Sequence, residues 1–91
     1  MIQIKQINLF DENGNFLGCI DGLSFKKIGN QFFEIINSNE NNNFKYLKMA
    51  SLFRNIDEDI ASFCFNKVDK NKLNILEQLM YELTYMNLTN K

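Results

Sequence analysis

The first fifty residues place apolar side chains in short runs separated by turn-forming residues, a pattern typical of β-strands. The clearest unit is a pair of apolar runs, residues 2–10 and 16–21, joined by a polar segment containing Asn13 and Gly14. Asn-Gly favours a tight turn because both residues tolerate positive φ. We therefore predict an antiparallel hairpin, with a β-bulge near Lys5 and Gln6, where the alternation of apolar positions shifts.

The same pattern predicts three further strands, at residues 23–28, 31–37 and 44–50. Gly29 and Asn30 predict a tight turn between the first two, and the polar segment 38–43 predicts an exposed loop before the third. Residues 51–67 are compatible with two structures. The acidic residues 57–59 are typical of the first turn of a helix, whereas the alternating segment 60–65 predicts a sixth strand, which its two aromatics and its Cys favour over the helix.

Residues 69–88 predict a C-terminal helix, with Asp69 as its candidate N-cap and no Gly or Pro within it. At 100° per residue one side of this helix is apolar, comprising Leu73, Ile75, Leu76, Leu79, Met80, Leu83 and Met86. It is the only long amphipathic element available to cover the sheet. The expected fold is α+β, an antiparallel β-meander of five or six strands with a C-terminal α-helix packed on one face. Residues 1–91 would form a single domain, in which residues 1–50 build the sheet.

The composition excludes several kinds of chemistry. The chain has no His, so it cannot build a Ser-His-Asp or Cys-His catalytic arrangement or a His-bearing zinc site. Cys19 and Cys64 have no CxxC spacing and lie among apolar residues, so both are predicted to be free core thiols. We predict no catalytic residues, no enzyme activity, no cofactor and no metal site. Two alternatives stay open, a weak calcium site at the alternate positions Asn55, Asp57 and Asp59 and an enzyme that uses carboxylates or Tyr.

The charge and the N-terminal sequence bear on partners and compartment. A net charge of −1 indicates neither a polybasic nucleic-acid binder nor an acidic nucleic-acid mimic. The opening residues, MIQIKQINLF, lack the apolar run of a secretion signal, and no stretch is long enough to span a membrane. We therefore expect a cytoplasmic protein that does not enter membranes.

Two tyrosines on the predicted helix are candidate partner-binding residues. Tyr81 and Tyr85 lie four residues apart, outside the apolar arc, and Leu88 lies on the same side as Tyr81. Tyr is enriched at the centres of protein interfaces, so we predict that these three residues bind a partner. The alternative is that the tyrosines cover the edge of the sheet.

The leading functional hypothesis is a small non-catalytic module that masks a surface on a larger bacterial protein, acting as a monomer or homodimer. The composition, rich in Asn, Ile and Lys with only two Ala, is typical of an AT-rich coding sequence. Compact His-free domains of this kind are similar in type to the accessory inhibitors of phages and mobile elements. That resemblance implies an anti-defence protein, an antitoxin or an immunity protein.

The alternative hypothesis is a single-stranded nucleic-acid-binding protein that uses the face of the sheet. Phe44, Tyr46 and Lys48, together with Lys26, combine aromatic and basic side chains on two predicted strands. In several small folds that bind single-stranded nucleic acid, aromatic side chains stack on the bases and basic side chains neutralise the phosphates. Edge strands also carry Lys to prevent aggregation, and the single Arg and the lack of net positive charge weigh against this hypothesis.

Overall fold

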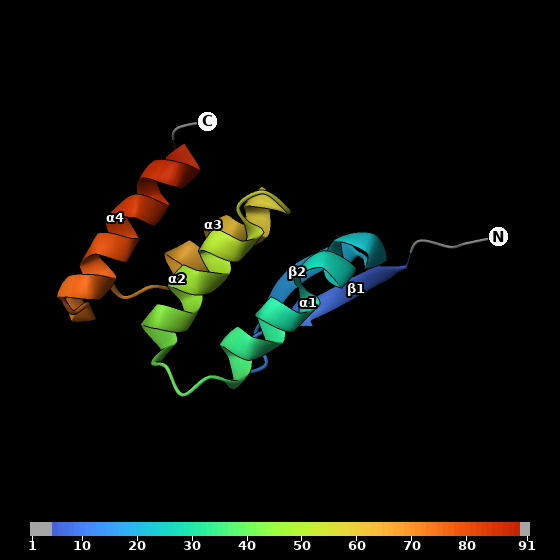
Figure 1. Cartoon of the computed structure of the whole chain (residues 1–91), viewed down its shortest axis with the longest axis horizontal. Helices are drawn as coiled ribbons and strands as arrows, with labels where there is room; N and C mark the ends of the chain where they lie inside the picture. The colour runs from blue at the N-terminus through green and yellow to red at the C-terminus, as the bar shows by residue number, and fades with distance from the viewer. Residues whose placement is uncertain (1–4, 90–91) are drawn as a thin grey trace.

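A β-hairpin followed by four α-helices makes up the computed structural model, which describes residues 5–89 (Figure 1). In chain order the elements are β1 (Gln6–Phe10), β2 (Phe16–Asp21), α1 (Gly22–Asn37), α2 (Asn42–Phe53), α3 (Glu58–Asn66), the short 3-10 helix η1 (Lys70–Lys72) and α4 (Ile75–Thr89). The predicted meander of five or six strands is therefore wrong. The described residues form one two-stranded antiparallel sheet and are mostly helical.

The hairpin prediction is confirmed. β1 pairs antiparallel with β2, and Leu9 lies opposite Gly18. The register shifts between Leu9 and Phe10, not near residues 5–6, and the extra residue belongs to β2. Within the turn only Gly14 has positive φ, and the Asp11 carboxylate accepts the N–H groups of Asn13 and Asn15. Residues 2–4 of the predicted first strand lie outside the described residues.

Residues 22–37 form α1, where two strands and a turn were predicted. The Asp21 carboxylate caps the helix by accepting the N–H of Ser24 at 2.8 Å. Buried residues recur at helical spacing at Ile28, Phe32 and Ile35. Gly29 therefore lies in the helix interior and not in a turn. A Cβ at Gly29 would lie 3.1 Å from the Phe25 ring, so its lack of a side chain lets that ring pack closely.

The predicted strand at 44–50 is also wrong, because these residues belong to α2. Asn41 caps α2 by accepting the N–H of Phe44, and Tyr46, Ala50 and Phe53 recur on its buried side. For residues 51–67 the favoured sixth strand is wrong, and the alternative, a short helix, is confirmed as α3. Its cap is Asp57, which accepts the N–H of Ile60 at 3.1 Å.

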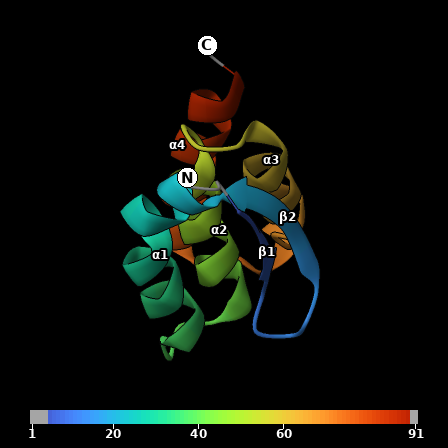
Figure 2. The same cartoon turned by 90° about the vertical axis from the view of Figure 1, so that its right-hand side faces the viewer.

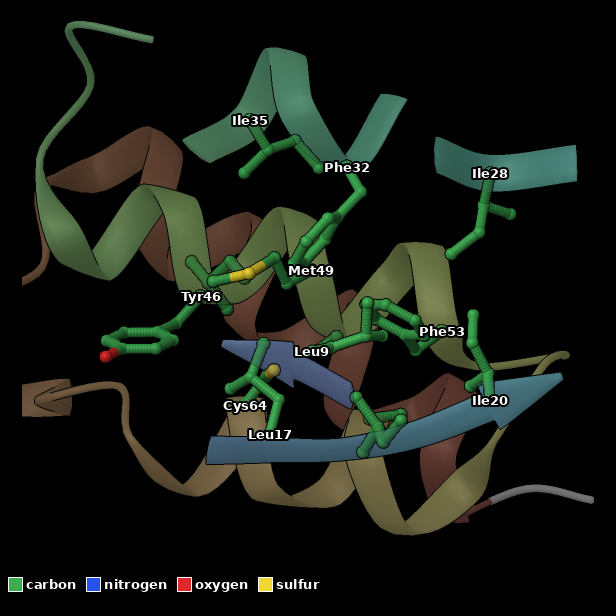
Figure 3. Packing of buried hydrophobic residues seen from close by; sticks show 14 of the residues in the cluster. Leu9, Leu17, Ile20, Ile28, Phe32, Ile35, Tyr46, Met49, Phe53 and Cys64 are labelled. Atoms are coloured by element: carbon green, nitrogen blue, oxygen red, sulfur yellow. The ribbon is translucent and has the colours of Figure 1, made fainter. Parts of the chain in front are cut away.

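The core lies between the hairpin, α1, α2 and α3, as Figure 3 shows. Leu47, Phe53 and Cys64 are completely buried at its centre. At Gly18 the hairpin approaches α3 so closely that a Cβ would lie 2.7 Å from Ile60 Cγ1.

The predicted packing of the C-terminal helix on a sheet is wrong. α4 contacts α2 and α3, at the end of the molecule far from the hairpin (Figures 1 and 2). The molecule is elongated along this direction, with a longest extent of 50 Å. Asp69 caps η1, and α4 starts separately at Ile75, directly after Asn74. There the Asn74 side chain accepts the N–H of Glu77, whose carboxylate accepts the N–H of Asn74.

Candidate protein-binding surfaces

A groove of about 460 Å³ runs between β1 and α1. Five consecutive residues of the hairpin, from Ile7 to Asp11, line one side of it. Because side chains alternate between the two faces of a strand, a run of consecutive lining residues means that the edge of β1 faces the groove. The other side is formed by α1 and carries the aromatic rings of Phe25, Phe32 and Phe33.

The edge of β1 that faces away from β2 offers main-chain hydrogen-bonding groups. Asp11 turns its main chain towards β2, because its N–H donates to the carbonyl of Asn15 at 3.0 Å. In an antiparallel pair, successive residues direct these groups alternately towards and away from the partner strand. The extra residue of the bulge lies in β2, so the alternation along β1 is unbroken. Asn8 and Phe10 therefore direct their N–H and C=O groups to the open edge.

The walls of the groove are aromatic and partly exposed. Phe33 is 52% exposed on α1 and Phe10 is 48% exposed on β1. Phe33 packs edge-on against Phe25, with ring centroids 5.9 Å apart, and Phe10 packs against Phe16 at 5.6 Å. These contacts hold the rings in place while leaving apolar surface accessible to a ligand.

The Asp11 end of the groove is fixed by a buried hydrogen-bond network. The Tyr46 hydroxyl, at the edge of the core in Figure 3, donates to the Asp11 carboxylate at 2.6 Å. Burial acts to raise the pKa of Asp11, but the hydrogen bonds from Tyr46, Asn15 and Asn13 outweigh it and lower the pKa below 3.8. Burial, and secondly the hydrogen bond to Asp11, raise the pKa of Tyr46 to about 12.

A buried lysine adds a second tie between the hairpin and the helices. Lys45 of α2 is only 6% exposed, and its Nζ donates to a Glu12 carboxylate oxygen at 2.6 Å and to the carbonyl of Ile36 at 2.9 Å. The turn, α1 and α2 therefore meet at one ammonium group, beside the Asp11 end of the groove. This contact fixes the position of the hairpin relative to α1, which form the two walls of the groove.

The second surface is the outer side of α4, which consists of large aliphatic residues. Leu76, Leu79 and Leu83 are each about 60% exposed, and Ile75 and Met86 lie beside them. These five residues belong to the apolar arc that was predicted to pack on the sheet, and the structure leaves them exposed, whereas Leu73 and Met80 of the same arc pack against the core. The inner side carries two buried polar residues, Glu77 and Thr84. Both are satisfied, since Glu77 also accepts from the Asn41 amide at 2.9 Å and Thr84 donates to the carbonyl of Met80.

The three predicted partner-binding residues lie on the α3 side of α4. Tyr81 is partly buried and stacks on Phe65 with ring centroids 4.6 Å apart. Leu88 packs against the core. Tyr85 is 51% exposed, and its ring is tilted relative to that of Phe65, with centroids 6.2 Å apart. Their role in binding stays a prediction, and Tyr85 is the most accessible of the three.

The residues of the predicted nucleic-acid platform do not lie on a sheet. Phe44, Tyr46 and Lys48 belong to α2 and Lys26 belongs to α1. Tyr46 is buried and bonded to Asp11, and the Lys48 ammonium lies over the Phe44 ring, 4.8 Å from its centroid. The arrangement of strands on which the nucleic-acid hypothesis depended is therefore absent from residues 5–89.

The cysteines and the acidic residues offer no clustered chemistry in the described chain. Both cysteines are free, with Cys64 buried as predicted and Cys19 exposed, contrary to prediction. Burial, together with the charge of Asp11, raises the pKa of Cys64 to about 12. Within residues 5–89 no three His, Cys, Asp or Glu side chains lie close enough to hold a metal ion. Asp57, from the alternative calcium site, serves as the α3 cap.

Sequence reasoning missed the groove because its walls come from a predicted strand and a helix mistaken for two strands. The available signal was the recurrence of Phe25, Gly29, Phe32 and Ile36 at helical spacing.

No helix among residues 5–89 is long and apolar enough to cross a bilayer. In comparisons with known proteins, no family model matches the chain, and neither a curated protein nor a solved structure shows significant similarity to it.

Proposed function

We propose that this chain is a non-catalytic protein-binding module that captures an extended segment of a larger partner along β1. The observation that carries the proposal is the open edge of β1 beside an aromatic groove. An added strand would pair with the outward main-chain groups of Asn8 and Phe10. Main-chain pairing supplies affinity in such complexes, and the pockets beside it select side chains.

The lining of the groove specifies the chemistry of the segment. The exposed rings of Phe10 and Phe33 favour aliphatic or aromatic side chains at alternate positions of the bound strand. Asp11 is the one charged residue in the lining, and its carboxylate already accepts four hydrogen bonds, including that of Tyr46. The centre of the segment is therefore expected to be uncharged. Since β1 has five residues, about five residues of the partner would be covered, and thereby masked.

The test begins with selection from a displayed library of random peptides, because the partner is unidentified. The selected peptide is then titrated into 15N-labelled protein and followed by NMR. We expect selected sequences with alternating apolar residues, and amide shifts concentrated at Asn8, Phe10 and Phe33. Selection of no peptide, or shifts located away from the groove, would overturn the proposal. An oligothymidylate titrated in parallel that shifts Phe44 and Lys48 instead would favour nucleic-acid binding.

A matched pair of variants isolates the main-chain contact. Asn8→Pro removes an N–H that points away from β2, so it blocks strand addition while sparing the hairpin ladder. Asn8→Ala keeps that N–H and serves as the control. Peptide binding should be lost in Asn8→Pro and retained in Asn8→Ala. If Asn8→Pro does not fold, Phe33→Ser provides the second test, because it removes an exposed ring of the groove wall. Unchanged binding in either folded variant contradicts the proposal.

A further inference from the structure

α4 is apolar on two opposite sides, and the rest of the described chain covers only one of them. The inner side packs on α2 and α3 through Met80, Tyr81, Leu88 and the buried parts of Glu77 and Thr84. The outer side forms a continuous stripe without a charged side chain, which we call the α4 stripe. It consists of Ile75, Leu76, Leu79, Leu83 and Met86, which are 51–80% exposed.

The spacing within the stripe is that of a helix–helix seam. Leu76, Leu79, Leu83 and Met86 are separated by three, four and three residues, the spacing at which apolar residues of paired helices interlock. The residues on its flanks include Gln78 and Glu82, both exposed and polar. A second helix with the same pattern therefore fits this surface.

The area of the stripe matches what a pair of copies needs. An unfolded chain exposes roughly 165 Å² for a residue of leucine's mass, so each stripe residue, at about 60% exposure, presents about 100 Å². Five such residues on each of two copies amount to about 1,000 Å² when all of this area is buried, which is the area that a biological interface should reach. The same patch on both partners also satisfies the requirement of a two-fold symmetric contact.

We infer that the chain forms a symmetric homodimer in which the α4 stripes of two copies pack against each other. The position of α4 permits this contact, because the helix lies at one end of the molecule and its outer side faces away from α2 and α3 (Figure 1). The β1–α1 groove lies at the opposite end and stays accessible. Dimerisation is thus independent of the proposed capture of a peptide, and the two inferences can fail separately.

Sedimentation equilibrium over a range of protein concentrations tests this inference directly. The wild type is expected to sediment at twice the 10.7 kDa of one chain at about 100 µM protein. The double variant Leu79→Glu, Leu83→Glu places charges at the centre of the stripe and should weaken association at least tenfold. Leu23→Glu on α1, where Leu23 is 59% exposed, is the matched control and should dimerise like the wild type.

Each outcome bears on the dimer. A wild type that is monomeric throughout this range, or larger than a dimer, overturns the inference, as does a folded double variant that still dimerises. Circular dichroism establishes folding, and the wild-type mass decides the question if the double variant does not fold. Peptide binding by the monomeric double variant would show that the groove functions without dimerisation.

Discussion

Replacing Tyr46 by Phe should destabilise the protein through the loss of one buried hydrogen bond. The Tyr46 hydroxyl donates to the Asp11 carboxylate at 2.6 Å, and both residues are 7% exposed. A hydrogen bond to a charged group contributes about 1.5–3 kcal/mol, and Asp11 keeps its bonds from the turn. We expect a loss of about 2 kcal/mol, which corresponds to a fall in Tm of about 8–16 °C for a domain of this size.

The dependence of this loss on pH provides a second, independent check. The folded state lowers the pKa of Asp11 from 3.8, so the ionised carboxylate stabilises the fold fully above that value. This stabilisation is lost as the pH falls through the lowered pKa. Because Tyr46 contributes to the lowering, the difference in stability between wild type and Tyr46→Phe should be largest at neutral pH and should narrow below 3.8.

Urea unfolding followed by circular dichroism, repeated from neutral to acidic pH, measures the loss of stability in Tyr46→Phe and the change of that loss with pH. Tyr85→Phe is the matched control, because Tyr85 is half exposed and its hydroxyl has no hydrogen-bond partner among residues 5–89. Its effect should stay within about 0.5 kcal/mol. The prediction is refuted if Tyr46→Phe is as stable as the control at neutral pH, or if its loss in free energy of unfolding relative to the wild type is the same in acid.

Two further predictions concern close packing and thiol reactivity. Gly18→Ala should cost about 2–4 kcal/mol in urea unfolding, since φ is +143° and the new Cβ would lie 2.7 Å from Ile60. Gly14→Ala, with positive φ but open space, should cost only about 1 kcal/mol, and equal losses would contradict the role of the contact. A thiol reagent at neutral pH should modify the exposed Cys19 quickly, whereas Cys64, with a pKa of about 12, should react only on unfolding. Two rapidly reacting thiols would show that the core around Cys64 opens readily.

The hairpin was predictable because its signal is local. Asn13 and Gly14 specify a turn within a few residues, and the flanking strands need only pair with each other. Residues 22–37 were not predictable from the same cues, because Gly29 and Asn30 resemble a turn while the burial of Ile28 and Phe32 follows a helical period. The packing of these residues against α2 outweighed the local turn propensity of Gly29 and Asn30.

The existence of the last helix followed from its sequence, but the choice of its covered side did not. The stripe around Leu79 is the more apolar side, yet the protein buries the side that contains Glu77 and Thr84. That choice depends on partners supplied from elsewhere in the fold, above all the Asn41 amide that bonds to Glu77. Amphipathicity alone identifies a surface to be covered and leaves open whether the same chain or another molecule covers it.

The placement of the groove and the α4 stripe at opposite ends of a 50 Å molecule has a consequence for avidity. Two copies joined at α4 would hold their grooves far apart, facing outwards. A partner that displays the captured segment twice, as a symmetric assembly does, could then be held at both sites. Once one groove has bound, the second groove would meet its segment at a high effective concentration. A weak affinity of each groove for one segment would therefore suffice for a long-lived complex.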